Sequence, residues 1–120
     1  DVVQNLGTKK TYYNRANQAL AVRFVAGSSQ YGSVGWVMPV GATWTSQLVV
    51  VSSCRGDFVK PAPCRGTGTQ NTLFTTTGTT TYCPLVAGQV YYVNVRNNIN
   101  ADGTDSCPAG KVCGVTLELK

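Results

Sequence analysis

The chain alternates apolar and polar residues in short runs that are separated by glycine, proline, serine and asparagine. Within residues 113–119, for example, Val115, Leu117 and Leu119 alternate with polar side chains. Alternation of this kind places successive side chains on opposite faces of an extended strand. Apolar residues at helical spacing occur nowhere for long, so the pattern predicts strands and turns throughout.

One of these runs, residues 43–53, predicts a central strand. Leu48 and Val50 fall on one face and Val49 and Val51 on the other, which is typical of a strand covered on both sides. The runs that fit a strand are 19–25, 33–38, 43–53, 72–82 (a surface strand or a hairpin around Gly78), 89–96 and 113–119. Roughly seven or eight short strands in one chain predict a β-sandwich or a barrel. We take an antiparallel, jelly-roll-like, disulfide-stabilised β-sandwich that forms a single domain over residues 1–120.

The composition agrees with a folded domain that has few charges. Charged residues make up 12% and hydrophobic residues 42% of the chain, whereas disordered chains are rich in charge and poor in apolar residues. The net charge is +5, from ten Lys and Arg against five Asp and Glu. This excess permits attraction to a polyanion or an anionic cell surface. It does not require such a partner, because the basic residues are dispersed along the chain.

The chain has five cysteines and no histidine. A zinc site needs closely spaced Cys and His ligands, so disulfides are the better interpretation, and they place the chain outside the cytosol. Because their loops are short and rich in turn residues, we predict the pairs Cys54–Cys64 and Cys107–Cys113. Cys83 is then left as a free thiol or as a link to another chain.

The chain has no run of about 18 apolar residues, so no transmembrane segment is expected. No signal peptide is visible either. We expect that an export signal was removed, or that the natural chain continues before Asp1, and that the domain is secreted or lies at the cell surface.

Conventional acid–base catalysis is not expected. Without histidine, the Ser-His-Asp and Cys-His arrangements are excluded within this chain. Among the few acidic residues, only Asp102 and Asp105 lie close together, and one polar loop rarely supplies the cleft that paired carboxylates need. We therefore do not expect an enzyme.

The same polar loop has the spacing of a calcium-binding segment. Oxygen-bearing side chains occur at Asn98, Asn100, Asp102 and Asp105. Hard oxygen ligands at alternate positions, followed by Gly103, suit Ca²⁺ on a tight loop. However, Ala109 stands where a final bidentate glutamate is required. The alternative is a solvated connection between strands, since these residues are also common in turns.

Aromatic residues beside a glycine-rich segment offer a possible surface for sugars. Tyr31 and Trp36 flank this segment (YGSVGW), and neither Gly32 nor Gly35 has a side chain that could cover a ring. We predict that Trp36 or Tyr31 is exposed and forms part of a shallow ligand platform. The alternative is that Trp36 fills the space between the two sheets.

Two further patterns have ordinary structural explanations. The triplet Arg55-Gly56-Asp57 resembles an integrin-recognition motif, but it also forms a natural turn after a strand. The stretch from Lys9 to Arg15 mixes basic and aromatic residues, as in proteins that bind single-stranded nucleic acid. An extracellular location argues against a nucleic-acid partner, and charges also protect the edges of sheets from pairing.

The C-terminal third of the chain resembles a known family. The stretch CPLVAGQVYYVNVR, followed by a loop and VTLEL, is similar to the end of bacterial extracellular β-sandwich accessory modules of the prepeptidase C-terminal type. The upstream segment SQLVVVSSCRGDF resembles an earlier strand and turn of these modules, whereas the extra cysteines depart from their pattern. The resemblance implies a non-catalytic module that is attached to, or secreted beside, larger exported proteins.

These inferences favour a non-catalytic extracellular binding or adhesion module whose partner is a glycan or a cell-surface protein. The alternative is a structural subunit of a pilus-like or filament-like extracellular assembly. In that case an edge strand would join neighbouring subunits by main-chain pairing.

Overall fold

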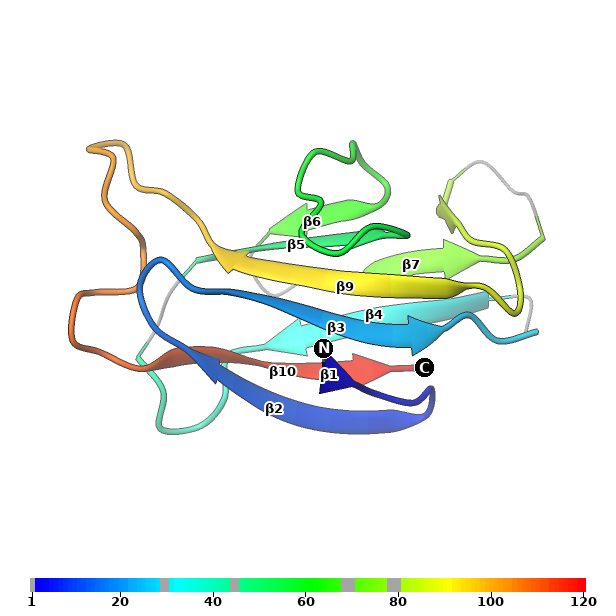
Figure 1. Ribbon diagram of the computed structural model, residues 1–120, viewed down its shortest axis with the longest axis horizontal. Coiled ribbons are helices and arrows are strands. Elements are labelled where there is room, and N and C mark those ends of the chain that lie inside the picture. The colour runs from blue at the N-terminus through cyan, green and yellow to red at the C-terminus, as the bar shows by residue number, and fades with distance from the viewer. Residues whose placement is uncertain (1, 29–30, 44–45, 68–70, 78–80) are drawn as a thin grey trace.

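The computed structural model describes residues 2–28, 31–43, 46–67, 71–77 and 81–120, and it shows two five-stranded sheets packed face to face (Figure 1). Sheet A contains, in spatial order, β1 (Val2–Val3), β3 (Ala19–Val25), β9 (Val90–Asn97), β5 (Gln47–Ser52) and β6 (Arg65–Thr67). Sheet B contains β2 (Thr8–Asn14), β10 (Cys113–Leu119), β4 (Tyr31–Val37), β7 (Thr72–Thr75) and β8 (Cys83–Pro84). The predicted fold class, an all-β sandwich with disulfides, is confirmed.

The chain passes from one sheet to the other at almost every connection. Without the two-residue strands β1 and β8, sheet B follows the order first, eighth, third and sixth, and sheet A the order second, seventh, fourth and fifth. This is the strand order of a jelly roll, in which two sheets share one interior. Within either sheet, β5 and β6 are the antiparallel neighbours that follow each other directly in the chain.

The predicted strands agree with the structure best where the alternation is cleanest. Strands β3 and β10 have the predicted bounds, and β9 differs by one residue at each end. Strand β5 is shorter than the predicted segment 43–53, and β4 begins earlier, at Tyr31. In the segment 72–82 the structure has the short strand β7, while the predicted turn at Gly78 lies outside the described residues.

The core lies between the sheets and contains the apolar residues of the inner faces. Val22 and Phe24 of β3 face Val115 and Leu117 of β10 across this interior, and the tilted rings of Phe24 and Phe74 pack with their centroids 6.0 Å apart. A single continuous core of this kind is what holds a small sandwich together.

Trp36 belongs to this core, so its predicted role as an exposed ligand platform is wrong. Its side chain is 2% exposed and points into the sandwich from β4. A Cβ atom on Gly66, in the opposite sheet, would lie 2.7 Å from the Cη2 atom of the indole. Gly66, rather than Gly32 or Gly35, is therefore the glycine that affects Trp36, because its missing side chain leaves space for the indole ring.

Gln4, which follows β1, connects the two sheets on the side of the sandwich where β2 and β3 lie. Its backbone N–H donates to the carbonyl of Arg23 in sheet A at 3.0 Å. Its side-chain Nε2 donates to the carbonyl of Leu117 in sheet B at 3.2 Å, and its Oε1 accepts a hydrogen bond from the Tyr12 hydroxyl at 2.8 Å. One buried amide thus links the two sheets where their strands do not pair.

The opposite side is closed by a disulfide that the sequence did not predict. Cys64, directly before β6 of sheet A, is bonded to Cys83 in β8 of sheet B. The predicted bond Cys54–Cys64 and the predicted free thiol of Cys83 are therefore wrong, and the free cysteine is the exposed Cys54. The prediction was wrong because it chose the cysteine nearest in sequence. The packing of the two sheets instead places Cys64 beside Cys83, which is 19 residues away in the chain.

The outer face of sheet A is covered by the loop of residues 53–63, which we call the covering loop. It is bound to the sheet by Asn94 of β9, whose side chain is completely buried. Asn94 Oδ1 accepts from the Gly56 N–H at 2.8 Å, and Nδ2 donates to the carbonyls of Cys54 and Asp57 at 3.0 and 3.2 Å. The covering loop explains how β5 is buried on both faces, as its sequence predicted.

Candidate functional site

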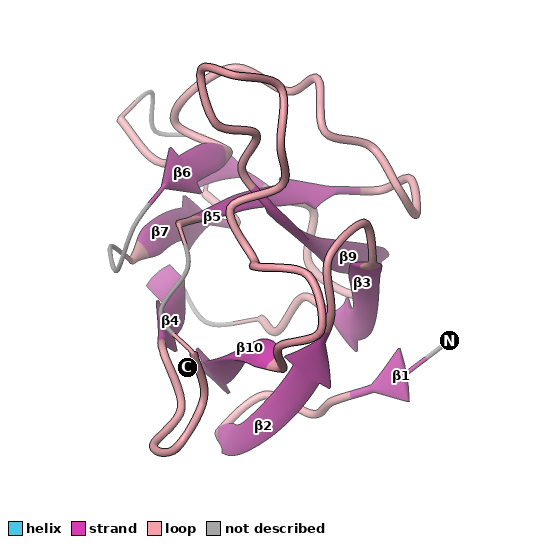
Figure 2. Ribbon diagram, turned by 90° about the vertical axis from the view of Figure 1, so that its left-hand side faces the viewer, coloured by secondary structure: helices cyan, strands magenta, loops and turns pink. Residues whose placement is uncertain are grey.

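One open cavity lies at the end of the sandwich that faces the viewer in Figure 2. Here the turn between β2 and β3 meets the long loop between β9 and β10. The two segments enclose an open cavity of about 540 Å³, lined by turn residues 16–17 and by loop residues 100 and 103–109. Pockets that bind small ligands have volumes of about 300–1,000 Å³, so this cavity is large enough for one.

Asp105 joins the two segments. One of its carboxylate oxygens, Oδ2, accepts a hydrogen bond from the backbone N–H of Asn17 at 2.8 Å, and Oδ1 accepts one from the N–H of Cys107 at 2.8 Å. Asn17 has a φ angle of 65°, in the left-handed region that asparagine tolerates better than most residues. Asp105 therefore positions the turn, and the Asn17 side chain extends from it into solvent.

A second cavity, of about 200 Å³, adjoins the first at the same two residues. It shares Asn17 and Asp105 with the first cavity and adds Gln18, Arg96 and Asn97. The amides of Asn17 and Gln18 can both donate and accept hydrogen bonds, while Arg96 can only donate. The two cavities together form a polar surface that offers both kinds of hydrogen-bonding group.

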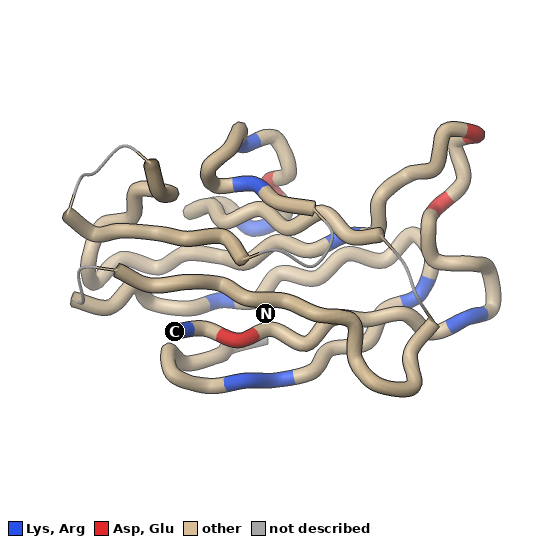
Figure 3. The backbone as a smooth tube through the Cα atoms, turned by 180° about the vertical axis from the view of Figure 1, so that it is seen from behind, with Lys and Arg blue, Asp and Glu red and all other residues tan. Residues whose placement is uncertain are grey.

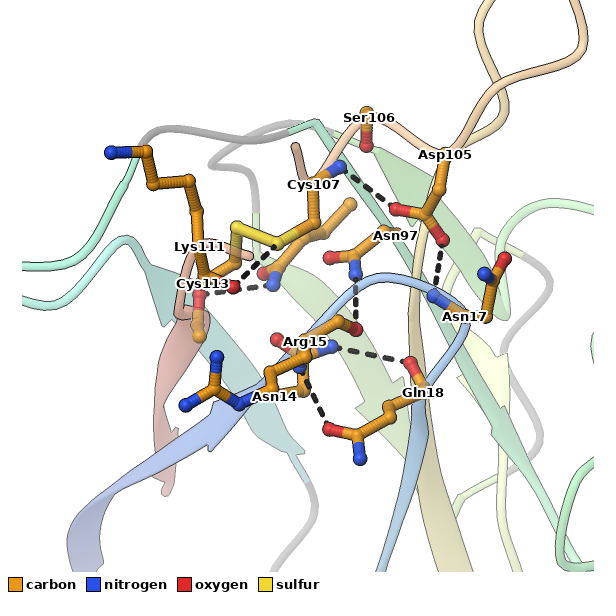
Figure 4. Close-up of a disulfide and its surroundings, with 12 residues drawn as sticks. Asn14, Arg15, Asn17, Gln18, Asn97, Asp105, Ser106, Cys107, Lys111 and Cys113 are labelled. Atoms are coloured by element: carbon orange, nitrogen blue, oxygen red, sulfur yellow. Dashed lines mark hydrogen bonds between the residues drawn. A yellow bond between two sulfur atoms is a disulfide. The ribbon is translucent and has the colours of Figure 1, made fainter. Parts of the chain in front are cut away.

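Beneath this surface, two buried asparagines have carbonyl oxygens without a donor (Figure 4). Asn97 donates through Nδ2 to the carbonyl of Arg15 at 3.3 Å, and Asn14 donates to the carbonyl of Gln18 at 3.3 Å. Among the described residues, neither Oδ1 atom has a hydrogen-bond partner. Unpaired buried acceptors are rare and costly. The polar character of this end of the sandwich therefore extends below the surface, to side chains that the packing of the core does not explain.

The disulfide Cys107–Cys113, which the sequence predicted, fixes the base of the β9–β10 loop. Cys113 is the first residue of β10 and is completely buried, and Cys107 lies directly after Asp105 and Ser106 (Figure 4). The loop that lines the larger cavity is therefore tied at one point to β10, an interior strand of sheet B. Such a tie reduces the freedom that a ligand would otherwise have to remove on binding.

The residues predicted to bind calcium are largely engaged in hydrogen bonds within and beside the loop. Asn98 Nδ2 donates to Ser46 Oγ at 2.8 Å, and Asn100 Nδ2 donates to Thr104 Oγ1 at 3.1 Å. Asp102 Oδ1 accepts from both the hydroxyl and the N–H of Thr104, at 2.6 and 3.0 Å, and these bonds lower the pKa of its carboxyl. In the described part of the chain, no three Asp, Glu, Cys or His side chains are grouped to bind a metal. Calcium binding stays a prediction.

Tyr31, the other predicted platform residue, is on the outer face of sheet B. It is 54% exposed and makes an edge-to-face contact with Tyr82, with ring centroids 5.8 Å apart. It lies at the start of β4, whereas Trp36 points into the core from the same strand. The two residues therefore do not form one site. The start of β4, where Tyr31 stands, lies at the other end of the sandwich from the polar cavities (Figure 1).

The Arg55-Gly56-Asp57 triplet is part of the covering loop. Asp57 Oδ2 accepts from the Ser52 hydroxyl at 2.8 Å and Oδ1 accepts from the Val59 N–H at 3.0 Å. These two hydrogen bonds, with that of Val59 the stronger influence, hold the pKa of Asp57 below its ordinary value. The carboxylate thus has a structural explanation within its own loop.

Sequence reasoning did not identify Asn17, Gln18 or Asn97 as site residues. Asn17 and Gln18 stand in a short polar turn, and Asn97 ends a strand, so each looked like an ordinary turn residue. A weak signal was present: both segments that meet at the site are rich in asparagine. Only the packing of the sheets shows that the two segments adjoin.

No protein-family model, curated protein or solved structure matches the chain. The fold and the disulfides define it as a disulfide-linked β-sandwich domain. Two disulfides are compatible with an extracellular location. In the parts of the chain that the structure describes, no helix is long and apolar enough to cross a membrane.

Proposed function

We propose that this domain is a non-catalytic extracellular binding module that takes a hydroxyl-rich ligand, such as a glycan, at the two polar cavities. The observation that carries the proposal is that the two cavities meet at Asn17 and Asp105, which line both of them. A ligand with several hydroxyl groups could contact both cavities at once.

The chemistry of the lining supports a polar ligand. Each hydroxyl of a sugar is both a donor and an acceptor, and the exposed amide of Asn17 matches both roles. Gln18 Oε1 accepts from the Arg15 N–H and Asn100 Nδ2 donates to Thr104, so the Gln18 amide group serves a ligand as a donor and the Asn100 carbonyl as an acceptor. Arg96 adds donors, and Pro108 and Ala109 add a small apolar surface in the larger cavity. Few precisely placed polar groups are sufficient to orient a ligand in such a site.

The carboxylates of the site support binding better than catalysis. Both oxygens of Asp105 accept backbone hydrogen bonds, and the pKa of Asp102 is lowered by Thr104. A general acid needs a raised pKa and a proton to give at neutral pH. The hydrogen bonds from Thr104 favour the ionised form of Asp102, and the two backbone hydrogen bonds of Asp105 suit that residue to organise the loop.

The resemblance to prepeptidase C-terminal modules agrees with this function. It suggests that the domain acts beside, or as part of, a larger exported protein and binds a glycan or another molecule at a cell surface. The two disulfides favour the same compartment.

The test is a glycan-array screen, followed by titration of the best ligand into the wild type, Asn17→Gly and Tyr31→Ala. Glycine keeps the left-handed backbone at position 17 but removes the amide. We expect binding to weaken about tenfold in Asn17→Gly, the equivalent of roughly one charge-neutral hydrogen bond, with an unchanged melting temperature. Tyr31→Ala should bind like the wild type. Binding lost in Tyr31→Ala and kept in Asn17→Gly would place the site on sheet B, and an array without any ligand would contradict the proposal.

A further inference from the structure

Strand β2 forms an open edge of sheet B. It pairs with β10 on one side over its whole length, Thr8–Asn14, and it is the first strand in the order of the sheet. In Figure 1 it is the lowest strand of the molecule, and none of the described elements lies beyond it. A seven-residue edge is long enough to pair with another strand, and folded proteins usually shorten, cover or charge such edges.

The hydrogen-bonding pattern shows which backbone groups of β2 point outward. Ser33 and Lys120 exchange both of their backbone hydrogen bonds, at 3.2 and 3.0 Å, so Lys120 and every second residue before it face β4. The intervening residues of β10, including Leu117 and Val115, therefore face β2. Their partners Lys10 and Tyr12 use their backbone groups inside the sheet, which leaves those of Lys9, Thr11 and Tyr13 at the open edge.

The sequence of β2, TKKTYYN, is complementary to itself when it is read in the opposite direction. In an antiparallel pair centred on Thr11, Lys9 faces Tyr13 of the second copy, and Lys10 faces Tyr12. Lysine and tyrosine attract each other through the face of the aromatic ring, and Lys10 already lies 5.6 Å from the Tyr12 ring centroid within one chain. Thr11 faces its own counterpart, where its outward N–H and C=O groups can make two hydrogen bonds.

Other registers are poorer. A shift of the centre to Lys9 or Lys10 places two lysine residues directly opposite each other, which is unfavourable. A shift to Tyr12 or Tyr13 shortens the overlap and leaves both lysines without a ring. The register centred on Thr11 has the longest overlap and no facing like charges.

We propose that two copies of this chain associate through β2, antiparallel and about a two-fold axis at Thr11, so that the two B sheets become one continuous sheet. A closed, self-complementary pairing of this kind is the commonest form of homodimer. It also accounts for the two adjacent basic residues on β2, at the lower edge of the molecule in Figure 3: in this register they face aromatic rings, and they disfavour the alignments centred on Lys9 or Lys10. The opposing explanation is that these lysines keep the edge unpaired.

The first experiment tests the register by cross-linking. In a Cys54→Ser background, which removes the exposed free thiol, Thr11→Cys places two thiols across the two-fold axis. Hydrogen-bonded antiparallel partners have Cα atoms about 5.5 Å apart, within the range of a disulfide. Mild oxidation should give a covalent dimer. The matched control Lys9→Cys, in which Cys faces Tyr13 of the partner, should stay uncross-linked. Equal cross-linking at both positions, or none at position 11, would overturn the proposal.

The second experiment tests the predicted Lys9–Tyr13 contact at an exposed position. Tyr13 faces Gly114 in its own sheet, so a charge at this position does not disturb the monomer. Tyr13→Glu should tighten the dimer, because it creates two ion pairs with Lys9, and Tyr13→Lys should weaken it about tenfold or more, because it creates two facing like charges. Sedimentation over a concentration series measures both. Equal dissociation constants, or a wild type that stays monomeric at the highest concentration, would contradict the proposal. The two variants share their site and size class, so a general loss of folding would appear in both.

Discussion

The two sheets share one interior but differ on their outer faces. Sheet A carries the covering loop, beneath which Leu48 and Val50 are fully buried. The outer face of sheet B has no such cover among the described residues, and Tyr31, Val37 and Leu73 are each at least 41% exposed. A strand in sheet A can therefore be apolar on both sides, whereas the strands of sheet B alternate.

This difference depends on a buried polar side chain, Asn94, which binds the covering loop to the outer face of sheet A. The covering loop is bound to sheet A through the side chain of Asn94 and through Phe58, whose ring centroid lies 5.1 Å from the Arg96 guanidinium carbon. On the outer face of sheet B, the hydroxyls of Thr11 and Thr116 bond to each other at 2.8 Å. Among the described residues, this pair holds no loop against the sheet. One buried amide thus adds a third layer to one half of the sandwich.

The largest effect should come from the inner face of sheet B. We expect Trp36→Ala to cost about 3–5 kcal/mol of the free energy of unfolding, because it opens a cavity in the core. Tyr31→Ala, on the outer face of the same strand, should cost less than about 1 kcal/mol. Urea denaturation of both variants measures the difference. Equal costs would mean that the two faces of β4 are not distinct.

The second largest effect should come from removal of the disulfide that joins the two sheets. A variant with Cys64→Ala and Cys83→Ala loses a link that spans 19 residues and should be destabilised by about 3 kcal/mol. The shorter link, six residues from Cys107 to Cys113, should contribute about 2 kcal/mol. Thermal melts of both double variants, with mass spectrometry of the remaining bond, test this order. The assignment of Cys54 as the free thiol fails if that residue resists alkylation in the native wild type.

A matched pair of valines tests the cover itself. Val50, beneath the covering loop, is 0% exposed, and Val37, on the open face of sheet B, is 48% exposed. We expect Val50→Ala to cost about 2 kcal/mol and Val37→Ala less than about 0.5 kcal/mol. The measurement is again the free energy of unfolding in urea. A small cost at Val50 would indicate that the covering loop opens readily.

The smallest effect concerns the pH dependence of the covering loop. Hydrogen bonds from Val59 and Ser52 lower the pKa of Asp57 in the folded protein. A lowered folded-state pKa contributes stability above the ordinary aspartate pKa of about 4, and this contribution is lost as the pH falls through the folded-state value. The wild type should therefore melt at a higher temperature than Asp57→Asn at neutral pH, and this advantage should shrink in acid. An advantage that persists unchanged at the lowest pH would contradict this explanation.

The sequence predicted the fold where one face of a strand is apolar and the other is not. In β3 and β10 the alternation around Val22 and Leu117 determined both the bounds and the buried face. Short strands such as β6 and β8 have too few residues for any period, and they form because the longer strands provide neighbours. Their existence is a property of the assembled sheets.

The errors at Trp36 and at Cys83 have a common physical cause. Each prediction used only neighbours in the chain: nearby glycines for the ring, and the nearest cysteine for the thiol. In a jelly roll, successive strands belong to different sheets, so the true neighbours are remote: Gly66 for Trp36 and Cys64 for Cys83. The candidate site was missed for the same reason, since Asn17 and Asp105 meet only after β2, β3, β9 and β10 are in place.

The strand order also has a consequence for how the chain acquires its structure during synthesis. The last two strands occupy interior positions, β9 between β3 and β5, and β10 between β2 and β4. Until these strands leave the ribosome, β3 is not joined to β5 in sheet A, and β2 is not joined to β4 in sheet B. The nascent chain therefore cannot complete either layer progressively from its N-terminus, and ordering is delayed until almost the whole domain has been released.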